Sequence, residues 1–227
     1  MKTLKQHIDE ALKIGKNLSE WSAYSCQPET KEELEQIIKD RISKEGPNCD
    51  LNDIDTSLIT DMSDLFAYMY FNGDISRWNV SNVKNMSKMF YRSKFNGDIS
   101  EWDVSNVKNM AYMFFSSKFN NNISNWNVSN VENMDHMFAE SSFNGDISRW
   151  NVSSVTKMSS MFYKSNFNGD ISKWNISKVR DMTWMFYNSD FNQDISKWNI
   201  SKDCNTKGMF EDCPIKEEYK PKSLQLW

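Results

Sequence analysis

The chain has 227 residues, a formal net charge of −4 and a hydrophobic fraction of 39%, and its mean hydropathy is −0.70. This polar composition approaches that of disordered chains, but the sequence also contains 14 Met, 14 Phe and 9 Trp, which predict an ordered interior. No apolar run approaches the ~20 residues of a membrane span, and no export, lipidation or sorting signal is recognisable. We therefore expect a cytoplasmic protein without membrane contact, or a cell-surface protein if its natural precursor is longer.

The cysteine and histidine content argues against a structural metal. Four Cys lie outside the middle of the chain without C-x-x-C spacing, and there are only two His. A disulfide between Cys26 and Cys49, or between Cys204 and Cys213, is conceivable, but a reducing cytosol favours buried free thiols. We expect no metal and no cofactor.

Two amphipathic helices are predicted at the start of the chain, and we expect residues 1–46 to form an N-terminal cap. The apolar spacing of Leu4, Ile8, Ala11, Ile14, Leu18 and Trp21 predicts a helix over 2–25. Thr30-x-x-Glu33 is a capping box that opens a second helix, which Gly46-Pro47 ends. Its apolar face consists of Leu34, Ile37, Ile38 and Ile42. The first helix either caps as well or joins a partner or a second copy of the chain.

From Phe71 onward the sequence repeats every 24 residues. Six units fill residues 71–214 and begin at Phe71, Phe95, Phe119, Phe143, Phe167 and Phe191. A degraded unit precedes them at 47–70, so we expect about seven turns over 47–214. Positions within a unit are numbered here from 1 to 24, with Phe71 at position 1.

Fixed columns within the unit predict an α/β repeat solenoid. Trp at position 8 and Val or Ile at position 10 point to one face of a strand. Apolar residues at positions 13, 16, 19 and 20 indicate a helical or 3₁₀ segment on the opposite side. Asn at position 9 is expected to form a hydrogen-bonded ladder between units. Asp at position 4 is expected to accept turn N–H groups rather than bind calcium.

The last unit loses the pattern, as a chain end requires. Asp203 and Thr206 replace the apolar residues of positions 13 and 16. We expect 215–227 to form a C-terminal cap, which would be sealed by Ile215, Tyr219, Leu224, Leu226 and Trp227.

The unit Phe71-Asn-Gly-Asp-Ile-Ser-Arg-Trp78-Asn-Val80-Ser-Asn-Val83, followed by Met86, Met89 and Phe90, resembles the repeat of the BspA-like leucine-rich-repeat proteins of bacteria. The resemblance covers 71–214 and extends to 46–57. It implies a leucine-rich-repeat-like, right-handed stack that is often used on cell surfaces for adhesion or protein binding. Small free-standing members also look like products of mobile elements, which often act on a single cellular target.

Variable columns indicate where a partner could bind. Position 7, beside each Trp and facing outward, contains Arg77, Glu101, Asn125, Arg149, Lys173 and Lys197. Position 18 contains Lys88, Tyr112, His136, Ser160 and Trp184, and position 21 contains Tyr91, Phe115, Ala139, Tyr163 and Tyr187. We weight Tyr112, Phe115, His136 and Trp184 most, because exposed aromatic residues anchor protein interfaces. The alternative is that these rings only pack over the helical side.

Charge and motif content argue against nucleic-acid binding and catalysis. The net charges of the six units are +4, −1, −3, +2, 0 and −1, so no basic stripe is sustained. No nucleophile, paired acid and base, or phosphate loop accompanies His136, so we expect no enzyme.

These patterns favour a non-catalytic protein-binding module, most simply a monomeric intracellular inhibitor or regulator that covers a protein target. Three alternatives remain. One is a surface adhesin. Another is a phage-borne inhibitor of a bacterial defence nuclease such as a CRISPR effector, whose target would be a nucleoprotein. The third is a structural protein that assembles through helix 2–25.

Overall fold

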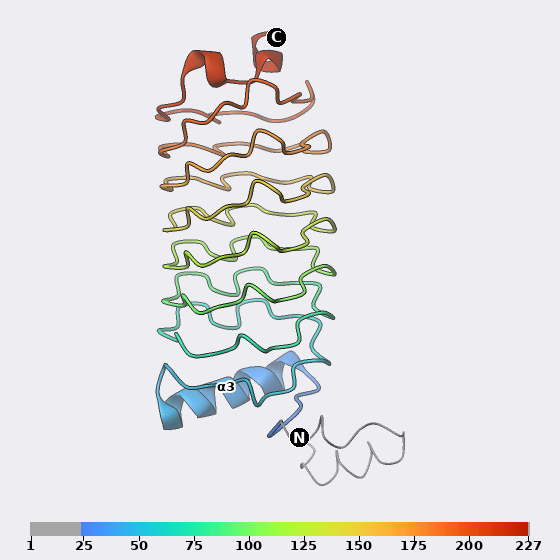
Figure 1. Cartoon of the computed structure of the whole chain (residues 1–227), viewed down its shortest axis with the longest axis vertical. Coiled ribbons are helices and arrows are strands. Elements are labelled where there is room, and N and C mark those ends of the chain that lie inside the picture. Colours follow the sequence, from blue (N-terminus) through green and yellow to red (C-terminus); the bar gives the residue numbers. More distant parts are fainter. Residues whose placement is uncertain (1–23, 227) are drawn as a thin grey trace.

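The computed structural model describes residues 24–226, which form a tall stack of coils (Figure 1). Parallel β-bridges connect residues that are 24 positions apart, running from Asp61 through Asn85, Asn109, Asn133, Lys157 and Asp181 to Asn205. Each coil therefore consists of one sequence unit and lies directly against its neighbours. The two ends of the described chain lie at opposite ends of the stack.

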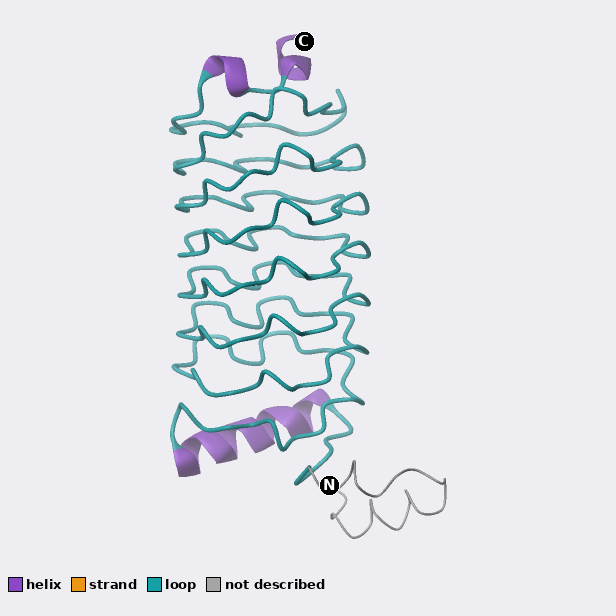
Figure 2. Cartoon of the chain, in the orientation of Figure 1, coloured by secondary structure: helices purple, strands orange, loops and turns teal. Residues whose placement is uncertain are grey.

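Helices occur only at the two ends of the described region (Figure 2). They are α3 (Lys31–Glu45), η1 (Glu217–Tyr219) and η2 (Lys222–Leu226). Between residues 24 and 226 the structure has isolated bridges but no β-strand, so the strand predicted at positions 8 to 10 is wrong. Trp78 N–H donates to the Ile75 carbonyl (3.1 Å), and Val83 N–H donates to the Val80 carbonyl (2.9 Å). These i to i+3 bonds bend the backbone into turns where a strand would be extended.

The helical segment predicted around positions 13 to 20 is also wrong. Positions 16, 18, 20 and 22 of each complete inner coil donate their N–H groups to the next coil. For coil 71–94 the bonds are Met86 to Asn109 (2.9 Å), Lys88 to Ala111 (2.9 Å), Phe90 to Met113 (3.0 Å) and Arg92 to Phe115 (2.7 Å). Positions 18 and 22 have positive φ, such as 56° at Lys88 and 51° at Arg92. This conformation turns the N–H groups toward the neighbouring coil, whereas a helix would bond them within its own segment.

Aromatic columns run through the interior of the stack. Rings at position 20 stack from coil to coil, with centroids 5.6 Å apart for Phe90 and Phe114, and rings at position 1 do so at 6.1 Å for Phe71 and Phe95. Each Trp of position 8 donates its indole N–H to a carbonyl of the preceding coil, as Trp102 does to Ile75 (3.1 Å). The Trp side chains are therefore buried without leaving a polar atom unpaired.

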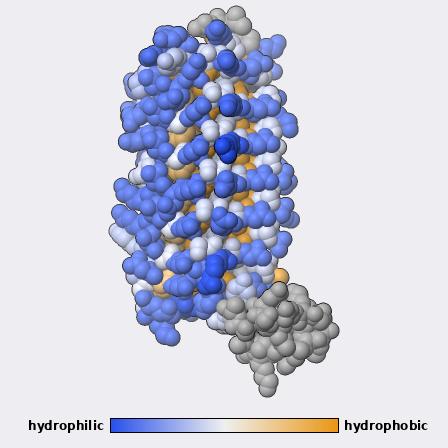
Figure 3. Space-filling view, in the orientation of Figure 1, coloured by the Kyte–Doolittle hydropathy of each residue, from blue (hydrophilic) through white to orange (hydrophobic). Residues whose placement is uncertain are grey.

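Polar columns cover this interior, and apolar atoms show between them in Figure 3. The carboxylate of Asp74 accepts the N–H of Ser76 (2.9 Å), which confirms the turn role predicted for position 4. That bond is also the main cause of the lowered pKa of Asp74. The ladder predicted for position 9 is wrong, because Asn79 accepts the N–H of Ser81 in its own coil (3.1 Å). The ladder between coils is formed instead by position 2, where Asn96 N–H donates to the side chain of Asn72 (2.7 Å).

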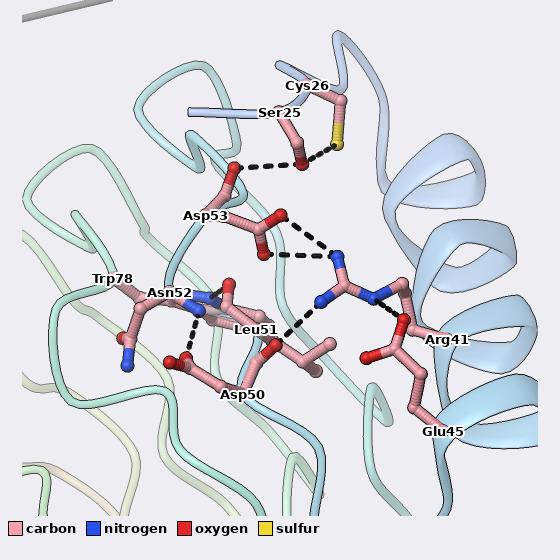
Figure 4. Close-up of polar contacts among 9 residues, drawn as sticks. All are labelled: Ser25, Cys26, Arg41, Glu45, Asp50, Leu51, Asn52, Asp53 and Trp78. Atoms are coloured by element: carbon pink, nitrogen blue, oxygen red, sulfur yellow. Dashed lines mark hydrogen bonds and ion pairs between the residues drawn. The ribbon is translucent and has the colours of Figure 1, made fainter. Parts of the chain in front are cut away.

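The N-terminal end of the stack is covered by α3. Thr30 accepts the N–H of Glu33, Leu34 and Ile38 are buried, and Gly46 follows the last turn, which confirms the helix predicted from the capping box. Arg41 joins α3 to the segment that follows it by hydrogen bonds (Figure 4). Its guanidinium donates twice to the Asp53 carboxylate (3.0 and 3.1 Å) and once to the Asp50 carbonyl (2.8 Å). The other predicted helix, including Trp21, lies outside the described residues.

The C-terminal segment covers only part of the last coil. Ile195 N–H donates to the Tyr219 carbonyl (3.0 Å), and Ile200 N–H donates to the Ser223 hydroxyl (3.1 Å). Ile215 is buried, while Tyr219 and Leu224 pack against the core. The N–H groups at positions 16, 18, 20 and 22 of this coil have no acceptor among residues 24–226, and they belong to Thr206, Gly208, Phe210 and Asp212.

All four Cys are free thiols in the structure, so neither conceivable disulfide is formed. Burial raises the pKa of each thiol, and it raises the pKa of Cys204 to about 11. None of the helices within residues 24–226 has the length and apolar character that crossing a membrane requires.

Candidate protein-binding face

One long side of the stack carries a series of aromatic rings, called here the aromatic face. It consists of Tyr68, Tyr91, Tyr112, Phe115, His136, Tyr163, Trp184 and Tyr187, from positions 18, 21 and 22. The ring contacts join Tyr68 to Tyr91 (5.2 Å), Tyr91 to Phe115 (4.9 Å), Tyr112 to His136 (4.3 Å), Tyr163 to Tyr187 (5.3 Å) and Trp184 to Tyr187 (6.5 Å). The structure thus brings Tyr112, Phe115, His136 and Trp184 together on one surface.

The backbone conformation explains why the side chains of the aromatic face lie at the surface of the stack. Positions 19 and 20 are buried in every coil of the repeat except the last, where Phe210 is partly exposed. Because position 18 has positive φ, the chain turns there and separates this side chain from the buried pair at positions 19 and 20, although the small side chain of Ser160 is itself buried. Tyr112 and His136 are half-buried, and Trp184 is 44% exposed. Gly208 makes room for Trp184, since a Cβ at Gly208 would lie 2.3 Å from the indole ring.

The N-terminal part of the aromatic face is basic. Tyr68 and Tyr70 are 66% and 75% exposed, and Lys94 lies 5.8 Å from the centre of the Tyr70 ring. The Arg92 guanidinium lies over both Tyr91 (5.6 Å) and Phe115 (5.7 Å). Cations on ring faces are attracted by the ring quadrupole, so this region favours a negatively charged contact.

A notch interrupts the aromatic face in its middle. The ring series breaks because position 21 is Ala139 and position 18 of the next coil is Ser160, and both side chains are buried. The resulting cavity of about 290 Å³ is lined by Tyr112, Phe115, His136, Glu140, Ser160, Tyr163 and Trp184. A cavity of this size lies at the lower end of the range of ligand pockets and has room for one side chain.

Burial determines the charge state of the groups around the notch. Burial lowers the pKa of His136, which is therefore neutral at pH 7, and its Nδ1 is buried with no hydrogen-bond partner among the described residues. Burial also raises the pKa of Asp135 and of Tyr112. Glu140 is exposed at the edge of the cavity, so it is the acidic side chain that the lining of the notch presents to solvent.

The chain matches a known protein family over most of its length. The family described as "Mycoplasma protein of unknown function, DUF285" matches residues 33–142 and 115–221. The chain belongs to the DUF285 family. This family is part of the BspA-like repeat proteins, in agreement with the resemblance found in the sequence. No curated protein and no solved structure matches the chain.

The position 7 column of this DUF285 protein lies in a separate region. All six residues of the column are exposed. Lys173 and Lys197 line a depression together with Asp170, Ser172, Gln193 and Asp194, which come from positions 3 to 6. The structure therefore does not combine position 7 with the aromatic face in one site.

Position 22 contributes to the aromatic face of this DUF285 chain but was missed in the sequence. Its residues are Tyr68, Arg92, Ser116, Glu140, Lys164, Asn188 and Asp212, and their variety was a signal that could have identified it. The reason for the miss is conformational. A helical reading of positions 16 to 20 does not reveal that positions 18 and 22 both have left-handed backbone and lie on the same side.

Proposed function

We propose that this protein is a non-catalytic protein-binding module that docks its partner on the aromatic face. The observation that carries the proposal is the contrast within each coil, where the backbone is constant but positions 18, 21 and 22 differ. Such a surface can acquire a specific partner without a change of fold. We further propose that the stack is a repeat solenoid related to leucine-rich repeats.

The chemistry of the aromatic face supports a protein partner. Partly exposed Tyr and Trp are the residues that most often dominate binding energy at protein interfaces. The surface is basic around Arg92 and Lys94 and acidic around Glu140, so it can select and orient a partner by charge. An inhibitor or regulator that covers its target is the version we favour, because the face is long and offers contacts on many successive coils.

The reactive groups support a role without catalysis. The buried Nδ1 of His136 has no hydrogen-bond partner among the described residues, whereas a catalytic histidine is usually oriented through that atom. The pKa of every Cys is raised by burial, so these thiols are poor nucleophiles at neutral pH.

Site-specific photocrosslinking followed by reconstitution tests the proposal. A benzophenone amino acid replaces Phe115 on the aromatic face or, as the control, exposed Lys178 at position 12. We expect one protein to crosslink only from position 115. After its identification, the purified partner should bind Tyr112→Ala and Trp184→Ala at least about tenfold more weakly than the unmodified chain.

The proposal is wrong if crosslinking occurs from position 178 and not from 115, or if both Ala variants bind the purified partner as tightly as the parent. Circular dichroism of each variant ensures that the comparison is made between folded proteins.

A further inference from the structure

We propose that the notch binds the guanidinium group of an arginine side chain from the partner protein. The inference deepens the proposed function, on which it rests, by naming the chemistry that the middle of the aromatic face recognises. The cavity, the charge of its coil and the cation contacts elsewhere on the same face carry it.

The walls of the notch suit a planar cation. Tyr112 and His136 stack face to face with ring centroids 4.3 Å apart and an interplanar angle of 8°, so each ring keeps one face on which a further planar group can stack. Trp184 and Tyr163 line the notch from the following coils. Aromatic faces attract cations, and guanidinium also stacks on them because it is flat and weakly hydrated.

The same face already holds cations on rings. Arg92 at position 22 lies over Tyr91 and Phe115, and Lys164 at position 22 lies 5.2 Å from the centre of the Tyr163 ring. Two coils lie between them, with Ser116 and then Glu140 at position 22, and the second of these coils has Ala139 at position 21. At the notch, therefore, this column carries a carboxylate in place of a cation.

Charge complementarity favours the same occupant. Coil 119–142 contains no Lys or Arg and three acidic residues, Glu132, Asp135 and Glu140. His136 is neutral at pH 7 because burial lowers its pKa, so it does not repel a cation. Lys164 is the opposing charge, since it interacts electrostatically with Glu140 at the rim. Arginine fits better than lysine because its fork can pair with the Glu140 carboxylate while its plane lies on a ring.

NMR titration of the full chain tests the proposal with N-acetyl-arginine-methylamide as the probe. The reported signals are the indole N–H of Trp184 and the ring protons of His136. We expect both to shift with a single millimolar dissociation constant. The citrulline analogue has the same shape without the charge, and it should bind about tenfold more weakly.

Variants separate charge from shape. Glu140→Gln should weaken binding of the arginine probe about fivefold, while Glu132→Gln, the same charge change elsewhere in the coil, should leave it unchanged. Lys164→Gln should strengthen binding, because it removes the competing positive charge. Ser160→Tyr should fill the notch and abolish binding without loss of folding, because Tyr112 occupies the equivalent position with φ of 59°.

Equal affinity for the arginine and citrulline probes would overturn the proposal, and so would an unchanged affinity of the arginine probe for Glu140→Gln. Tighter binding of the corresponding leucine derivative, N-acetyl-leucine-methylamide, than of the arginine probe would also overturn it. A different result would refute the proposed binding of a protein partner on the aromatic face, namely an unchanged affinity of Tyr112→Ala and Trp184→Ala for the purified partner. A notch that ignores arginine while those variants still lose the partner refutes the arginine site alone.

Discussion

The two halves of each coil obey different rules. In the first half, positions 5, 8, 10, 13 and 16 carry nearly the same apolar residue in every coil, because these side chains are buried in the stack. Positions 18, 21 and 22 differ between coils, although their backbone bonds are the same in each coil. Position 18, for example, is Lys88, Tyr112 and His136 in three successive coils. In the first half buried side chains hold the stack together, while in the second half the N–H bonds between coils add to the stacked Phe column of position 20.

The difference shows how the stack can vary its surface without losing stability. Four N–H groups per coil bond to the next coil through positions 16 to 22, so the outward side chains there are not needed for stacking. A substitution at these positions changes the surface and costs little, whereas a substitution in a stacked column disturbs three coils at once.

The largest effect is expected where a stacked column is broken. Trp126→Ala should lower the free energy of unfolding by about 3–5 kcal/mol, because it leaves a cavity and removes the indole bond to the Ile99 carbonyl (3.0 Å). Tyr112→Ala, on the aromatic face, should cost only about 1 kcal/mol. Urea denaturation followed by circular dichroism measures both, and equal losses would contradict the division between the two halves.

The next effect concerns the close approach of two coils near the N-terminal end. A Cβ at Gly73 would lie 2.0 Å from the Cys49 carbonyl oxygen. A Cβ at Gly97 would lie 3.4 Å from the equivalent atom, the Gly73 carbonyl oxygen. Gly73→Ala should therefore cost about 2 kcal/mol more than Gly97→Ala. Thermal unfolding of the pair checks this, and a larger loss for Gly97→Ala would show that ring crowding around Phe95 decides instead.

A smaller effect should follow from the left-handed backbone of the variable half. Lys88 has φ of 56°, which β-branched residues adopt only with strain, so Lys88→Val should lower the free energy of unfolding by about 1 kcal/mol. Lys84→Val is the control, because Lys84 is exposed in the same coil and is not among the residues with positive φ. Identical stabilities of the two variants would show that position 18 imposes no conformational restriction.

The smallest effect is expected from pH. Because burial lowers the pKa of His136 below its ordinary value of 6.5, the unfolded chain binds the proton first as pH falls. Stability contributed by the neutral imidazole is thus present above pH 6.5 and is lost as pH falls through the folded pKa. His136→Asn, which tolerates the positive φ, should lose less stability than the parent between pH 7.5 and 5. Parallel pH curves would contradict this.

Much of the architecture was readable from the residues. The 24-residue period placed the coils correctly, and the capping box placed α3 (Lys31–Glu45) within a residue. The strand at Trp78 and the helical segment before Phe90 were wrong, because apolar spacings of two and three also arise when a chain turns repeatedly around a core. The aromatic residues of the candidate site were found, whereas Arg92 and Glu140 were not.

The sequence by itself determined the period, the buried columns and the variable positions, because a stacked repeat requires the same apolar residue at each contact with its neighbours. Only the tertiary structure decided that backbone N–H groups point from coil to coil and that positions 18 and 22 share a face. It also decided that Ala139 and Ser160, which are small and 21 residues apart, open one notch. The physical reason is that hydrogen bonds between coils, rather than local propensity, select the left-handed conformation that brings these side chains together.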